Sequence, residues 1–113
     1  MKNYVQKGET LTLTAPYAVS SGGGALVGSI FGVAATDVAS GEEGEFQVAG
    51  VFDLVRETGA STAWSAGDLI YWDNINKRAT KTATSNKLIG VAARAAADGD
   101  ATGRVRLNAA FIS

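Results

Sequence analysis

The sequence predicts an all-β protein, a small antiparallel sandwich or barrel with one short helical turn. Three observations predict this class. Short runs of alternating apolar and polar residues recur along the chain. Fourteen glycines and one proline favour many tight turns. The two clearest apolar runs, 67–73 and 87–93, are joined by a polar stretch over 74–86, which is the pattern of a β-hairpin.

The length of 113 residues predicts one domain, over 9–113, preceded by a flexible polar arm over 1–8. A chain of this size buries only a small core, so extra burial in an oligomer would help it. Charged residues make up 19% of the chain, below the usual share of about 25%. Such a low share is what a protein with a partly covered surface would show.

The first predicted strand covers 9–15. Leu11, Leu13 and Ala15 fall on one face of this run, and threonines occupy the other. Pro16 ends the strand, because proline has no backbone N–H to donate.

The next predicted strand covers 25–35, after a flexible turn over 20–24. This run is nearly all apolar, which favours burial, and its glycines at 28 and 32 predict bends or close approaches. A polar connection over 37–44 follows.

A further strand is predicted over 45–55. One phase of this run carries Phe46, Val48, Phe52 and Leu54. Val51 and Val55 fall in the other phase, so either both faces are covered or a bulge near Gly50 switches the phase.

The segment 56–66 predicts the one helical turn, with Ser61 or Thr62 as its cap, Trp64 as its anchor and Gly67 as its end. After the hairpin described above, 79–84 predicts a weak polar strand inside the 74–86 connection.

The last predicted strand covers 103–108, and 109–112 extends it. Val105 and Leu107 alternate with Arg104 and Arg106, which predicts that the two arginines lie on a solvent face. Six or seven short strands with glycine turns are typical of a small sandwich or barrel.

Composition excludes several classes of function. The chain has no cysteine and no histidine, so it has no disulfide and no zinc site of the thiolate or imidazole kind. Its net charge is −1 with dispersed basic residues, which argues against a nucleic-acid partner. No apolar window approaches 18 residues, and the polar start is unlike a signal peptide, so we expect no membrane partner and synthesis in a cytoplasm.

Few residues are suited to catalysis. Ser85 and Lys87 lie close in sequence, and Glu42, Glu43 and Glu45 form an acidic group. Both sets fall in stretches that predict exposed turns, where solvated side chains are the favoured interpretation.

Two motifs resemble ligand-binding loops but lack residues that such loops require. The glycines at 22–24 lack the lysine that a phosphate-binding loop requires. The run 73–76 begins like a calcium loop, but Arg78 and Thr84 replace the glycine and the glutamate at its sixth and twelfth positions. The sequence therefore predicts no enzyme, no metal site and no cofactor.

Tyr71 and Trp72 are the conspicuous side chains. As neighbours on a strand they point to opposite faces, so one belongs to the core. The other lies on a second face, where either a partner or a small second core under the 56–66 loop covers it. Both are therefore interface candidates.

The order of several motifs resembles a family of short phage and prophage proteins, the capsid cement or head decoration proteins. The motifs are Gly28-Ser-Ile-Phe-Gly-Val-Ala34, Ala39-Ser-Gly-Glu-Glu-Gly44, Ala49-Gly-Val-Phe-Asp-Leu54, Gly67-Asp-Leu-Ile-Tyr-Trp-Asp73, Ile89-Gly-Val-Ala92 and Val105-Arg-Leu107. The resemblance extends from about residue 3 to 111.

This resemblance implies a β-rich homotrimer on the exterior of the phage capsid, with the major capsid protein as its partner. It implies no catalytic residue. Together with the polarity of the arm, it predicts that Lys2, Asn3, Tyr4 and Val5 contact the coat. The alternative is another virion part, a tail or fibre β-module, although the chain shows none of the repeats that fibre modules often have.

Overall fold

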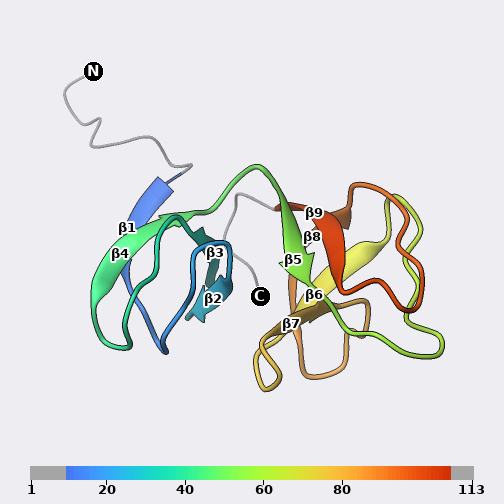
Figure 1. The fold of residues 1–113 in the computed structure, drawn as a ribbon, viewed down its shortest axis with the longest axis horizontal. Coiled ribbons are helices and arrows are strands. Elements are labelled where there is room, and N and C mark those ends of the chain that lie inside the picture. Colours follow the sequence, from blue (N-terminus) through green and yellow to red (C-terminus); the bar gives the residue numbers. More distant parts are fainter. Residues whose placement is uncertain (1–9, 108–113) are drawn as a thin grey trace.

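The computed structural model describes residues 10–107, which contain strands and no helix. The strands are β1 (Thr10–Thr14), β2 (Gly24–Val27), β3 (Ile30–Ala34), β4 (Glu43–Gln47), β5 (Val51–Val55), β6 (Leu69–Asp73), β7 (Arg78–Thr80), β8 (Lys87–Ala92) and β9 (Thr102–Leu107). They form two antiparallel sheets, which lie side by side in Figure 1. The predicted all-β class is confirmed.

The first lobe, residues 10–49, contains a four-stranded sheet in the order β1-β4-β3-β2. In β1, Leu11 and Leu13 are half-buried while Thr12 and Thr14 are exposed, so the predicted alternation is confirmed. The edge of β1 that faces away from β4 pairs with no other strand of the described residues.

The run 25–35 is two strands, so the prediction of one bent strand is wrong. β2 and β3 form a hairpin in which Val27 pairs with Ile30. Gly28 has a φ of 60°, the left-handed conformation that a two-residue hairpin turn requires at its first central position. The glycine therefore reverses the chain.

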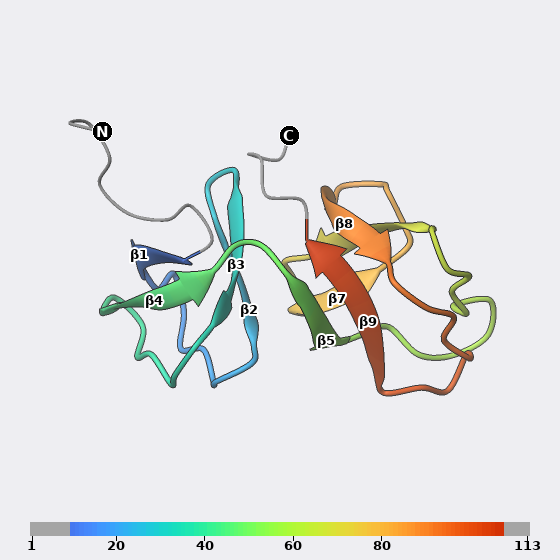
Figure 2. The same ribbon diagram turned by 90° about the horizontal axis from the view of Figure 1, so that it is seen from above.

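The run 45–55 is also two strands, and they belong to different sheets. β4 ends at Gln47, and the chain crosses to the other sheet before β5 begins at Val51 (Figure 2). Gly50 lies at this crossing with a φ of 120°. The predicted phase is confirmed for Phe46, Val48 and Leu54, which are buried, whereas Val51 and Val55 are exposed.

The second lobe, residues 50–107, contains a five-stranded sheet in the order β5-β9-β8-β6-β7. β6 and β8 pair as predicted, and β7 lies on the other side of β6. The outer strands curl towards each other, because Arg56 bridges Ala79 and the Glu57 N–H donates to the Ala79 carbonyl at 2.9 Å. The sheet is thus a half-barrel.

The polar strand predicted over 79–84 is shorter in the structure. It is β7, which begins at Arg78 and ends at Thr80. The strand predicted over 103–108 is β9, in which Val105 and Leu107 are buried and Arg106 is exposed, as predicted.

The helical turn predicted over 56–66 is wrong. This segment is an extended loop in which Trp64 forms an isolated antiparallel bridge with Ala96. The Trp64 N–H donates to the Ala96 carbonyl at 2.8 Å, and the Ala96 N–H donates back at 3.1 Å. A partner far along the chain therefore supplies the hydrogen bonds that a helix would have made internally.

The larger core joins the two lobes. β3 is buried on both faces: Phe31 and Val33 belong to the core of the second lobe, while Ala34 belongs to a smaller core in the first. The Phe31 ring packs against Trp72, with their centroids 4.9 Å apart. The lobes therefore share apolar packing as well as a chain crossing.

Tyr17 is a polar contact at the same junction. Its hydroxyl donates to the Gly24 carbonyl at 2.7 Å, and the Lys77 ammonium of the second lobe lies 4.2 Å from its ring centroid. Burial raises the pKa of the Tyr17 hydroxyl. The neutral phenol is therefore the form that this junction holds.

Candidate functional site

The two sets of residues weighed for catalysis lie in different lobes. Glu42 and Ser85 are exposed in turns, as predicted. Glu43 and Glu45 are exposed within β4, and Lys87 is half-buried at the start of β8, so the prediction of a turn is wrong for these three residues. Among residues 10–107, no three acidic side chains come together as a metal site would require. The same described residues include no helix long and apolar enough to cross a membrane.

The run that begins like a calcium loop is a hairpin turn between β6 and β7. The Asp73 carboxylate accepts the backbone N–H groups of Ile75 at 3.0 Å and Asn76 at 3.1 Å, and the Asn76 side-chain amide at 2.8 Å. These bonds, led by that amide, lower the pKa of Asp73. The carboxylate oxygens bind the turn itself, which is the structural role that Asp and Asn often have.

Of the two aromatic neighbours, Trp72 is the core residue. Trp72 is 2% exposed and packs on Phe31. Tyr71 is half-buried on the other face of β6, where it lines a shallow depression of about 360 Å³ with Leu69 and Lys81. Tyr71 is therefore the one of the pair that a partner can reach without unfolding the chain.

The outer face of the five-stranded sheet carries an apolar row. Leu69 pairs with Val91, Val91 with Arg106, and Arg106 with Val51, so these four side chains follow one another across β6, β8, β9 and β5. Leu69 and Val51 are each 52% exposed. We call this row, together with Asp53, Val55 and Arg104, the outer face.

An ion pair lies beside the apolar row. The Arg104 guanidinium donates from Nε to Asp53 at 3.1 Å, and this hydrogen bond lowers the pKa of the Asp53 carboxyl. Arg106 has no salt bridge with any of the described residues. The outer face therefore combines exposed apolar side chains with an arginine whose charge has no partner in the described chain.

The first lobe presents a different face. Thr12 pairs with Glu45 and Thr14 with Glu43 across β1 and β4, and all four residues are exposed. The Thr12 hydroxyl donates to the Glu45 carboxylate at 2.9 Å. We call these four residues the acidic face.

The charges are divided between the lobes. Residues 10–49 contain no lysine or arginine, and their acidic residues are Asp37, Glu42, Glu43 and Glu45. Residues 50–107 contain eight basic and six acidic residues, a net charge of +2. The first lobe is therefore purely acidic, while the second is weakly basic.

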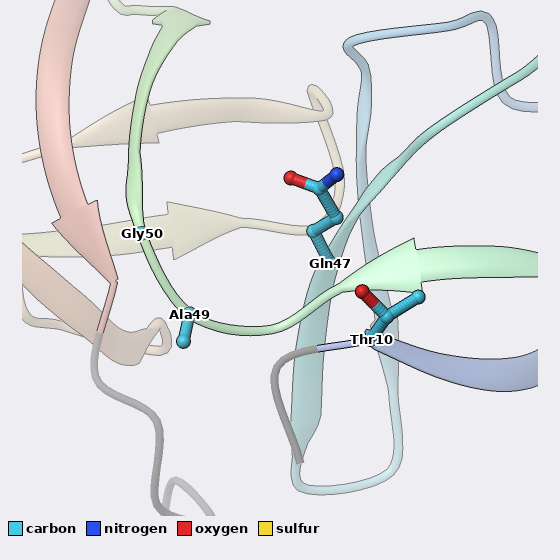
Figure 3. Close-up of a pocket in the computed structure, with 4 residues that line it drawn as sticks. All are labelled: Thr10, Gln47, Ala49 and Gly50. Atoms are coloured by element: carbon cyan, nitrogen blue, oxygen red, sulfur yellow. The ribbon is translucent and has the colours of Figure 1, made fainter. Parts of the chain in front are cut away.

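A depression of about 380 Å³ lies where the chain crosses between the lobes. Thr10, Gln47, Ala49 and Gly50 line it (Figure 3). These residues offer one hydroxyl and one amide side chain and no titratable group. Among the described residues, these four therefore offer groups for hydrogen bonding and none for acid–base or metal chemistry.

Arg56 is a residue that sequence reasoning missed. It is 3% exposed, its Nη1 donates to the carbonyls of Ala97 at 2.8 Å and Asp100 at 2.7 Å, and its Nη2 donates to the Thr62 carbonyl. Its guanidinium lies 5.1 Å from the Trp64 ring centroid. Arg56 therefore holds two loops of the second lobe together. No pattern in the sequence signals this role, because all of these hydrogen bonds go to backbone carbonyls, which any type of residue supplies.

The arm residues Lys2, Asn3, Tyr4 and Val5 lie outside the described residues, so their role as coat contacts stays a prediction. Comparison with models of protein families finds a match, described as phage cement protein, over residues 5–107. No curated protein and no solved structure matches the chain.

Proposed function

The chain belongs to the phage cement protein family, and we propose that it binds the outside of the assembled phage head as a homotrimer and stabilises the head. The family match carries this proposal, because it spans 5–107 and so includes both lobes. Membership makes the chain a structural component of a phage virion. The proposal adds the exterior site, the major capsid protein as partner, and the trimer.

The mechanism we infer is mechanical. DNA packaging pressurises a phage head, and an oligomer that bridges neighbouring coat subunits resists their separation. Each contact needs only modest affinity, because several linked contacts raise the overall binding strength. The exposed faces of the two sheets and the depression at the crossing are surfaces suited to such contacts, and none of them requires a cofactor.

Mixing the purified protein with expanded, undecorated heads of the phage and imaging the particles tests the function directly. We expect regularly placed density on the outer surface, and heads that withstand heating better than bare heads. If the heads stay undecorated although the added protein is folded, this result contradicts the proposal. Density on tails in the intact virion would instead favour a tail or fibre component.

The arm is the segment we propose to contact the coat. It leads into β1, an edge strand, and the Ala15 N–H bonds back to Glu42 beside β4. Because backbone direction alternates along a strand, Thr12 and Thr14 turn their N–H and C=O groups to the edge that faces away from β4. A strand added at or beside this edge is one of the recurring modes of protein recognition.

Deleting residues 1–7 should abolish binding to undecorated heads, because it removes Lys2, Asn3, Tyr4 and Val5 and leaves both lobes intact. The measurement is co-sedimentation of protein with heads, with light scattering to show that the oligomer persists. Ile75→Ala, a change at a side chain that is 89% exposed in the second lobe, is the matched control and should bind normally. Unchanged head binding after the deletion would refute the role of the arm.

A further inference from the structure

The outer face is an exposed sheet surface with no cover among the described residues. We propose that it docks on the acidic face of a second copy of this chain, so that the copies associate head to tail. This inference rests on the proposed self-association and assigns the two surfaces that make it.

The apolar row and Val55 supply the driving force for association at the outer face. Val51 and Leu69 each expose about half of their surface, and Val55 exposes 61%. Clustered apolar side chains of this kind are what interaction surfaces bury, because covering them removes apolar area from water. Arg106 lies within this row, so the surface that covers the row must also carry negative charge.

The acidic face carries negative charges at the same spacing as the arginines of the outer face. Arg104 and Arg106 are two residues apart on β9, and Glu43 and Glu45 are two residues apart on β4. Side chains two apart on a strand project from the same face about 6.8 Å from each other. Two glutamates can therefore meet two arginines when the sheets stack face to face, and the threonine methyl groups of β1 adjoin the apolar row.

The division of charge selects head-to-tail contact over a symmetric one. The first lobe has a net charge of −4 and the second +2. Pairing two acidic faces, or two outer faces, would place like charges together, whereas pairing unlike lobes places opposite charges together. A head-to-tail interface closes into a ring when its rotation permits, and the proposed trimer is such a ring.

Charge reversal tests the assignment. Glu43→Lys and Arg106→Glu change exposed residues for which the structure shows no side-chain hydrogen bond or salt bridge among the described residues. Each single variant should weaken self-association roughly tenfold or more, since it sets like charges in the interface. The double variant carries both reversals and should recover the association, because the lysine introduced at position 43 of one copy then meets the glutamate introduced at position 106 of the next.

Glu42→Lys is the matched control. It changes the net charge by the same amount as Glu43→Lys, but Glu42 borders the opposite side of the sheet with Val19 and Val38. It should associate as the wild type does. Analytical ultracentrifugation of all variants measures the dissociation constants, with circular dichroism to check folding. A salt series on the wild type adds a readout free of mutation, because screening should weaken the contact.

The outcomes separate this inference from the proposed function. Single variants that associate as the wild type does, or a double variant no stronger than the singles, would overturn the assignment of surfaces, while head binding would still decide the function. A wild type that stays monomeric would overturn the assignment and the trimer. Wild-type protein that fails to bind heads but shows the loss and recovery would refute the cement role and support the interface.

Discussion

Gly90 shows how closely β8 and β9 approach. A Cβ added at Gly90 would lie 2.0 Å from the Arg106 carbonyl oxygen, which belongs to the backbone and cannot rotate away. Gly90→Ala should therefore force the strands apart and destabilise the fold by about 3 kcal/mol, the upper end of the range for overpacking. Chemical denaturation measures this. Gly99→Ala is the control, because a Cβ there meets nothing within 4 Å. Equal stabilities of the two variants would contradict the account.

At the scale of single residues, the sequence predicts a side chain's role correctly when that role depends on residues adjacent in the sequence. Alternation places Arg106 on a solvent face and Val105 in the core, as the structure shows. Alternation cannot say which of Tyr71 and Trp72 is the core residue, because that depends on Phe31 arriving from the other sheet.

The β6–β7 turn is an element whose stability depends on Asp73. The carboxylate accepts three hydrogen bonds within the turn, so Asp73→Ala should destabilise the protein by about 1 kcal/mol at neutral pH. The pKa of Asp73 lies below its ordinary value of 3.8 in the native protein, so this contribution is complete above that value. It disappears as the pH falls through the lowered pKa.

Thermal unfolding of the wild type and Asp73→Ala across pH 7 to pH 2 measures this turn. The two melting temperatures should converge at the acid end. Glu42→Ala, which removes an exposed carboxylate for which the structure shows no hydrogen bond within residues 10–107, should match the wild type throughout. A difference between wild type and Asp73→Ala that is independent of pH would refute the role of the charged carboxylate.

The sequence predicts a strand well when the strand's own alternation, or a polar stretch that joins it to its partner, carries the signal. β1 and β9 alternate clearly, and the β6–β8 pairing follows from two apolar runs around a polar stretch. The mistakes over 25–35 and 45–55 have one cause, which is that continuous apolar sequence hides a reversal or a change of sheet. The segment 56–66 is mispredicted for a different reason, since its bonds come from Ala96.

The two lobes should unfold together, because Phe31 of the first lies in the core of the second. Phe31→Ala should cost about 3–5 kcal/mol and lower the stability of both lobes. Both tryptophans, Trp64 and Trp72, lie in the second lobe, so their fluorescence reports on that lobe while circular dichroism reports on all strands. We expect the unfolding transitions measured by fluorescence and by circular dichroism to coincide.

Ile75→Ala, at an exposed position, is the control for Phe31→Ala and should leave both probes unchanged. If Phe31→Ala left the fluorescence transition in place, the lobes would be independent folding units. That result would also contradict the prediction of one domain over 9–113.

The division of charge also governs which reagents can map the assembled particle. Lys77, Lys81 and Lys87 are the lysines of residues 10–107, and all three lie in the second lobe. Amine-reactive cross-linkers therefore leave the first lobe unmarked even when it touches a neighbour. Between Lys7 and Arg56 trypsin has no site to cut, so the first lobe is released as one long peptide. Carboxylate-directed labels and a protease that cleaves beside glutamate are the chemistry suited to footprinting that half of the molecule.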